Sequence, residues 1–142
     1  MPRYVVDASV AAKWYFEEEH STEAARLLAQ DDVELLAPDF IRIEVAAVAW
    51  KRVIRNEITA EKAEEIVDEL GRVPIDLVPT VDLVAAALQT ALRVRRSVYD
   101  SVYLTYAVQA GAALLTGDRK LYDAIKAGEL AAHIAWIGDL AQ

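Results

Sequence analysis

Residues 4–9 read Tyr-Val-Val-Asp-Ala-Ser, a short apolar run that ends at an acidic residue and continues into small ones. The run is too short for a helix and is rich in residues that favour extended backbone. It therefore predicts a buried strand that ends at Asp7. Similar short apolar runs recur along the chain, bounded mostly by proline, glycine or acidic residues. We predict strands at residues 4–6, 33–37, 75–78, 112–116 and 134–137.

The segments between these runs have apolar residues at helical spacing. Thr59 is a suitable N-cap, and Gly71, Gly111 and Gly128 are suitable stops. Strands that are apolar throughout and alternate with helices indicate a parallel sheet covered on both faces. The expected fold class is α/β, in three layers (α/β/α) with a short, mostly parallel central sheet. We predict helices at residues 9–16, 21–30, 40–56, 60–70, 81–95, 97–110 and 121–127.

The composition limits the chemistry. A chain of 142 residues predicts one domain, residues 1–142, with a core of its own. The absence of cysteine excludes a disulfide framework, a thiolate zinc site and a cysteine nucleophile, and it fits a cytoplasmic location. No apolar stretch approaches the ~20 residues of a membrane span, so we expect no membrane partner. The formal net charge of −8 argues against binding nucleic acid over the whole surface, but it allows a local acidic site that holds metal.

Single acidic residues stand at the ends of two predicted strands. In parallel α/β sheets the functional site lies beyond the carboxyl ends of the strands, which is where Asp7 and Asp118 fall. Each could instead serve only as the N-cap of the following helix. Glu44 lies on a helix where the residues three and four positions away on either side are all apolar. A buried carboxylate needs a partner, so Glu44 either binds a ligand, pairs with a base such as Arg42, or reaches solvent at the edge of the stripe.

A fourth acid, Asp100, lies in the first turn of a predicted helix. It follows Ser97 by three residues, which resembles a capping box, and it follows Arg96 by four, which allows an ion pair. Each acid alone is therefore ordinary, but the four together are less so. Converging carboxylates suit hard cations such as Mg²⁺ or Mn²⁺. Such an ion can ionise a water and stabilise charge on a phosphate, so the chain needs no Ser, Cys or His nucleophile.

The four acids lie in motifs that resemble those of PIN-domain proteins, specifically the VapC-type toxin ribonucleases of prokaryotic toxin–antitoxin pairs. The matching stretches are residues 5–10, 43–45, 99–104 and 114–121, and their order and spacing extend the resemblance over the whole chain. The resemblance implies a PIN-like fold and an endoribonuclease that depends on Mg²⁺ or Mn²⁺. Ser101 stands where the family often has alanine, a small departure.

The resemblance also assigns roles to individual residues. It makes Asp7, Glu44, Asp100 and Asp118 the catalytic and metal-binding acids, with Ser9 and Thr116 as supporting hydroxyls. It implies three partners: an RNA substrate, a cognate antitoxin and a second copy of the chain in a homodimer or larger oligomer. For RNA phosphates, the cations nearest the acids are Arg96, Arg119 and Lys120; these could equally be solvated residues at helix ends.

Two other features of the sequence bear on these expectations. Asp123 follows Arg119 by four residues, so an exposed ion pair is favoured over a fifth site acid. Residues 13–16 read Lys-Trp-Tyr-Phe, and three adjacent aromatic positions cannot all face one core, so we expect at least one at a groove or interface.

Three alternatives remain at the level of the sequence. A phospho-acceptor receiver domain would need paired acids after its first strand, but Asp7 is followed by Ala8. A binding-only module of the same fold would use the four acids as caps and ion pairs. A PIN nuclease of RNA processing would keep the chemistry and lack the toxin role. Convergence of the four acidic side chains on one region separates the nuclease readings from the others.

Overall fold

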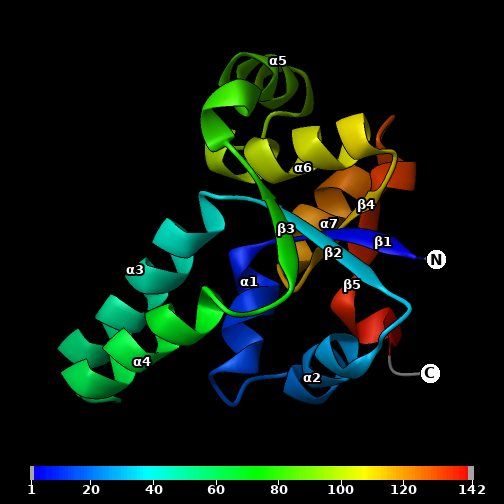
Figure 1. Ribbon diagram of the computed structural model, residues 1–142. Coiled ribbons are helices and arrows are strands. Elements are labelled where there is room, and N and C mark those ends of the chain that lie inside the picture. Colours follow the sequence, from blue (N-terminus) through cyan, green and yellow to red (C-terminus); the bar gives the residue numbers. More distant parts are fainter. Residues whose placement is uncertain (1, 141–142) are drawn as a thin grey trace.

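The computed structural model describes residues 2–140, and its centre is a sheet of five parallel strands (Figure 1). The strands lie in the order β3-β2-β1-β4-β5, so the first strand of the chain is in the middle. All four pairings are parallel, as the apolar runs predicted. The strands are β1 (Arg3–Val6), β2 (Glu34–Pro38), β3 (Ile75–Val78), β4 (Ala113–Thr116) and β5 (Ile134–Trp136).

The helices pack on both faces of this sheet. Figure 1 shows α1 and α2 on the opposite side of the sheet from α5 and α6, with α3 and α4 projecting from it as a pair. Helix α6 packs against β1, β2 and β4, and α7 packs against β4 and β5. The helices are α1 (Ala8–Ala11), α2 (Ser21–Ala29), α3 (Ile41–Ile54), α4 (Ala60–Leu70), α5 (Val84–Val94), α6 (Val98–Ala110) and α7 (Arg119–Lys126).

The strand order creates a switch point at the carboxyl end of β1. The chain runs from β1 outward to β2 and β3 on one side, and then returns to place β4 on the other side of β1. Loops that leave β1 and β4 therefore diverge to opposite faces and leave a crevice between them. Asp7 leaves β1 and Asp118 follows β4, so both acids belong to this crevice.

The structure corrects two of the predicted helices. Residues 9–16 were expected to form one helix, but α1 tightens into the 3₁₀ helix η1 (Ala12–Trp14). The Trp14 indole N–H donates to the carbonyl of Ala24 in α2 at 3.0 Å, which holds this tightened turn against its neighbour. Residues 81–95 begin as the 3₁₀ helix η2 (Thr80–Leu83) before α5, because Asp39 accepts hydrogen bonds from the backbone and side chain of Thr80.

The core lies between the two central strands and the helices over them. Val5, Val6, Leu114 and Leu115 have no exposed surface. Strands buried this completely explain why their sequences lack alternation of apolar and polar residues. Two further 3₁₀ helices, η3 (Ala131–His133) and η4 (Ile137–Leu140), flank β5. Within residues 2–140, the helices are all too short or too polar to cross a membrane.

Candidate active site

Asp7 is the centre of the site and the most buried of its acids. It is 7% exposed, at the point where β1 ends and α1 begins. One carboxylate oxygen accepts from the hydroxyl of Ser9 at 2.5 Å and from the backbone N–H of Val10 at 3.2 Å. The other accepts from the hydroxyl of Thr116 at 2.6 Å. Asp7 is therefore an N-cap, as one reading of the sequence had it, and it also binds the end of β4.

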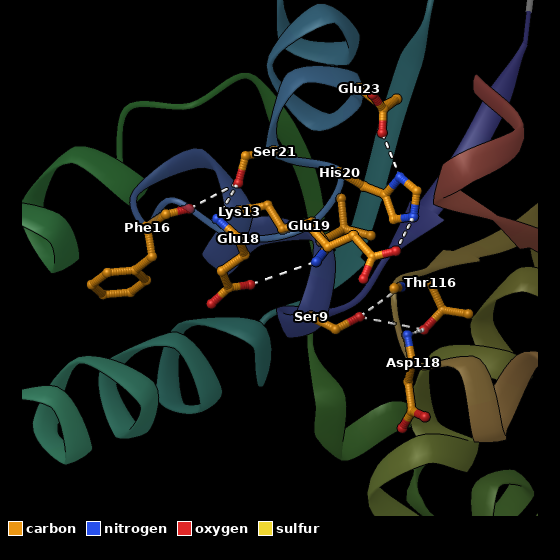
Figure 2. A network of polar contacts seen from close by, with 12 residues as sticks. Ser9, Lys13, Phe16, Glu18, Glu19, His20, Ser21, Glu23, Thr116 and Asp118 are labelled. Atoms are coloured by element: carbon orange, nitrogen blue, oxygen red, sulfur yellow. Dashed lines mark hydrogen bonds and ion pairs between the residues drawn. The ribbon is translucent and has the colours of Figure 1, made fainter. Parts of the chain in front are cut away.

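The hydroxyls of Ser9 and Thr116 connect the ends of β1 and β4. They are directed toward each other in Figure 2, with their oxygens 3.4 Å apart. The backbone N–H of Gly117 donates to the Ser9 hydroxyl at 2.8 Å, and the backbone N–H of Asp118 donates to that of Thr116 at 3.0 Å. Each hydroxyl thus donates to Asp7 and accepts from the β4–α7 loop. This arrangement fixes both the carboxylate and the loop that carries the next acid.

Glu44 lies in the first turn of α3 and reaches across to α6. Its carboxylate accepts a hydrogen bond from the phenol of Tyr103 at 2.5 Å. Tyr103 is 2% exposed, so the phenol is a fixed donor within the core. Glu44 itself is half-buried, because part of the apolar stripe around it reaches solvent: Ile41 is buried, but Ala47 is exposed. Glu44 lines a hollow of about 440 Å³, with Phe40 and Tyr99 stacked in its wall at a ring separation of 5.6 Å.

Asp100, in the first turn of α6, and Asp118, the N-cap of α7, complete the set. The backbone N–H of Asp100 donates to the Ser97 hydroxyl at 3.0 Å, so Ser97 is the N-cap of α6. The carboxylate of Asp100 lies 3.5 Å from a guanidinium nitrogen of Arg96. Asp118 caps α7 by accepting from the backbone N–H of Leu121 at 3.2 Å. The capping and pairing alternatives considered for both acids are therefore real contacts, and they coexist with placement at the site.

Electrostatic interactions connect the four acids. Burial raises the pKa of Asp7 most strongly, and the Asp100 charge raises it further, against the three hydrogen bonds that lower it. Burial also raises the pKa of Glu44, with contributions from Asp7 and Asp100. Burial raises the pKa of Asp100, and Asp118 adds to the rise, although Arg96 opposes it. Asp7, Glu44 and Asp100 each therefore feel the charge of another acid, which disfavours their charged forms, and a bound cation relieves that repulsion.

The donor set fits a hard divalent ion held partly through water. Within residues 2–140, no three acidic or histidine side chains are arranged so that they could enclose an ion directly. Mg²⁺ does not need such a cage, because it keeps several of its waters and takes one or two carboxylates from the protein. The four acids and the two hydroxyls offer only oxygen ligands, which suit Mg²⁺ and Mn²⁺ and disfavour softer metals.

Sequence reasoning missed two residues that the fold brings to the site. Tyr103 lies in the stretch 99–104 that carries the family resemblance, but its partner Glu44 is 59 residues away in the sequence. Lys13 was considered only as part of an aromatic run, but its side chain is 9% exposed and it approaches the β4–α7 loop. A Cβ on Gly117 would lie 2.7 Å from the Lys13 side chain and 3.4 Å from the Ser9 hydroxyl, so Gly117 leaves the room that Lys13 fills.

Lys13 is held in place by a chain of charges. Figure 2 shows its ammonium directed at the Glu18 carboxylate, to which it is an ion-pair neighbour at 3.5 Å. Arg52 donates to the same carboxylate at 2.7 Å. Arg52 in turn lies over the ring of Phe16, which is buried. The turn from α1 into η1 brings Lys13 to this position, and no pattern in the sequence predicts that turn.

The basic residues near the acids differ in their exposure and in the acids with which they pair. Arg96 is half-buried and pairs with Asp100. Arg119 is exposed at the start of α7, where it lies 3.4 Å from Asp123, as expected for an exposed pair. Lys120 is exposed beside it. Arg93 pairs with Glu129 at the other end of α7.

Comparison with known proteins identifies the family. Residues 4–127 match the PIN domain family. A relative from Pyrobaculum aerophilum, Ribonuclease VapC3, is 33% identical over 121 residues, which are 84% of this chain and 92% of the relative.

Solved structures agree on the fold. PAE2754 from Pyrobaculum aerophilum superposes with a TM-score of 0.70 at 19% identity, covering 98% of this chain and 86% of its own. VapC20 from Mycobacterium tuberculosis, a sarcin–ricin loop cleaving toxin, superposes with a TM-score of 0.65 at 16% identity, covering 91% of this chain and 93% of its own. The chain therefore belongs to the PIN domain family, as a VapC-type member.

Proposed function

We propose that this protein is an endoribonuclease that depends on Mg²⁺ or Mn²⁺ and acts in the cytoplasm as the toxin of a VapBC-type toxin–antitoxin pair. One observation carries the proposal: at the switch point of the sheet, acids from separate elements interact, so that the charges of neighbouring acids raise the pKa values of Asp7, Glu44 and Asp100. A merely structural set of caps has no reason to converge in this way. The VapC3 relative, which bears the name of a ribonuclease, supports the same conclusion.

Asp7 and Asp100 would be the main ligands of the ion, and Asp118 and Glu44 would complete its shell, directly or through bound water. When bound, a divalent ion makes a water molecule acidic enough to attack and offsets the negative charge that builds up on the phosphate. The products would be a 5′-phosphate and a 3′-hydroxyl, as the family resemblance implies for attack by water.

The surrounding residues would stabilise the charged forms of these acids and fix their orientation. Three hydrogen-bond donors stabilise Asp7 as a carboxylate, although burial raises its pKa. The phenol of Tyr103 does the same for Glu44 and also fixes its direction, because a buried phenol cannot move far from its place in the core. Glu44 would orient the attacking water. Arg96, Arg119 and Lys120 would attract the RNA phosphates toward an otherwise acidic surface.

The partner proteins would bind through apolar surface. Side chains of α5 and η2 that face solvent, among them Val81, Leu88 and Leu92, are large and apolar, as is typical of a homodimer interface. The exposed apolar side chains of α3 and α4, such as Ile54 and Val67, would serve a cognate antitoxin. Both partners follow from the resemblance to VapC proteins.

Cleavage of RNA tests the proposal. Purified protein should cleave single-stranded RNA with Mg²⁺ or Mn²⁺ present and should lose that activity when EDTA removes the ion. Asp82→Asn is a matched control, since Asp82 is an exposed acid in η2, and it should cleave like the wild type. Absence of cleavage with either ion, across structured and unstructured RNAs and with the antitoxin removed, would favour the alternative of a non-catalytic acidic binding module.

A further inference from the structure

We infer that Arg119, Trp136 and Tyr122 form a stacking subsite for one unpaired base of the RNA, next to the phosphate that is cleaved. The inference rests on the proposed ribonuclease function and adds to it a base-binding subsite beside the acids. Neither aromatic residue belongs to the acid site or to the motifs that indicated the family.

The three side chains form one layered cluster. The guanidinium carbon of Arg119 lies 4.9 Å from the centre of the Trp136 ring and 5.8 Å from that of Tyr122. The two rings are themselves 5.8 Å apart and inclined at 42°. Arg119 is the outermost member, with 60% of its side chain exposed, and Asp123 steadies its Nε at 3.4 Å. The cluster therefore presents a cationic plane to solvent, backed by an aromatic ring.

The cluster lies directly beside the acid site. In the sheet Thr116 is the register partner of Trp136, so the two side chains project from the same face of neighbouring strands, whose backbones lie ~4.8 Å apart. Thr116 is the residue whose hydroxyl donates to Asp7. Arg119 immediately follows Asp118, the acid that caps α7. A base stacked on this cluster would therefore belong to a nucleotide adjacent to the reacting phosphate.

The Trp136 ring is held rigidly. The imidazole of His20 meets it edge-on, with ring centres 5.6 Å apart at 83°, and His20 is itself placed between Glu19 and Glu23 (Figure 2). Gly138 provides the space on another side: a Cβ there would lie 2.9 Å from Cδ1 of the indole and closer still to its Nε1. A ring fixed in this way loses little entropy when a base stacks near it.

Charge also favours RNA at this position. Helix α7 carries Arg119, Lys120 and Lys126 against Asp123, a local balance of +3 − 1 = +2, in a chain whose net charge is −8. Because a guanidinium is planar and carries several N–H donors, that of Arg119 can stack on a base and also donate to a phosphate. Proteins read unpaired RNA in this way, by stacking splayed bases on aromatic rings and guanidinium planes, whereas paired bases in a duplex are not available.

Binding of two probes tests the subsite. The probes are a short labelled oligoadenylate and a ribose-phosphate oligomer of the same length without bases, measured with Mg²⁺ in an Asp100→Asn background that prevents cleavage. Trp136→Leu should weaken binding of oligoadenylate about tenfold, the typical contribution of one stacked base, and should change binding of the abasic oligomer less than twofold. Arg119→Gln should weaken binding of both probes, because it also removes a charge.

Matched controls and a conservative variant keep the test decisive. Trp50→Leu and Arg55→Gln remove an exposed tryptophan and an exposed arginine on α3 and at its end, and they should leave both affinities unchanged. Trp136→Phe keeps a ring and should restore most of the affinity for oligoadenylate; thermal melts show whether each variant is folded. A Trp136→Leu protein that is folded and binds both probes like its parent, or loses both equally, would overturn the subsite.

Failure of the subsite and failure of the proposed function give different results. If the wild type cleaves RNA but the Trp136 variants show no dependence on the base, the subsite alone is wrong. If the wild type neither cleaves RNA nor binds either probe, the ribonuclease proposal is wrong, and the subsite falls with it.

Discussion

Replacing Asp100 with asparagine tests whether its carboxylate acts in catalysis or only stabilises the fold. The change keeps the shape of the side chain and removes its charge. The cap of α6 does not depend on that charge, since the Ser97 hydroxyl accepts from the backbone N–H of residue 100. We therefore expect Asp100→Asn to fold like the wild type and to lose RNA cleavage.

The expected change in stability is small because two effects oppose each other. The pair with Arg96 is partly exposed, with side chains 28% and 31% accessible, and such pairs contribute about 0–1 kcal/mol. Its loss is offset by relief of the burial and of the Asp118 repulsion that raise the pKa of Asp100. The melting temperature should change by at most about 4 °C, which corresponds to roughly 1 kcal/mol for a chain of this size.

The expected change in rate is large, since a ligand of the catalytic ion is lost. We expect a decrease of more than 100-fold in kcat/KM, equivalent to about 2.7 kcal/mol of transition-state stabilisation. A discontinuous assay with a labelled RNA, together with a thermal melt of the same preparation, measures both quantities. Cleavage within tenfold of the wild-type rate would refute the role of Asp100 at the site, and a melting temperature lowered by more than about 10 °C would show that its carboxylate is structural.

Two further predictions follow from the hydrogen bonds and charges of the site. Tyr103→Phe removes the donor to Glu44 and should lower cleavage about 10–100-fold, the usual effect of losing a group that orients a ligand; unchanged kinetics in a folded variant would contradict the positioning role. The pKa of Asp7 is raised in the folded state, so neutral Asp7 favours folding at low pH and that contribution is lost as pH rises through the folded pKa. In EDTA, the melting temperature of Asp7→Asn should therefore rise relative to that of the wild type as the pH increases from the acidic range, where carboxyl groups titrate, to neutrality. A difference in melting temperature that stays constant with pH would contradict this prediction.

Much of the fold could be predicted because two features of the sequence indicate each strand: a short apolar run, and the residues that end it. In a parallel sheet the carboxyl ends share one edge, so Asp7 and Asp118 could be placed together from the pattern alone. The switch from α1 to η1 could not be predicted, because the Trp14 contact that holds it depends on α2.

The parts of the site that depend on tertiary packing could not be predicted from the sequence. The donor to Glu44 comes from Tyr103, and no spacing rule connects residues on helices from different parts of the chain. Trp136 was assigned to a strand, as found, but its place beside Thr116 follows from register, which the short strand leaves open. Lys13 is similar: its approach to Gly117 follows from a local turn. The interface expected for the aromatic residues at 14–16 stays a prediction, although Phe16 itself is buried in the core.

Calorimetric titration with Mn²⁺ tests most directly whether the four carboxylates form a metal site. The wild type and an Asp7→Asn/Asp100→Asn double variant should be compared, with Asp82→Asn as the control and a thermal melt of each protein. A metal site at these acids predicts Mn²⁺ binding by the wild type and by Asp82→Asn, and loss of that binding in a double variant that remains folded. Equal Mn²⁺ binding by the double variant, or none by the wild type with a single-stranded RNA present, would contradict a metal site formed by these acids.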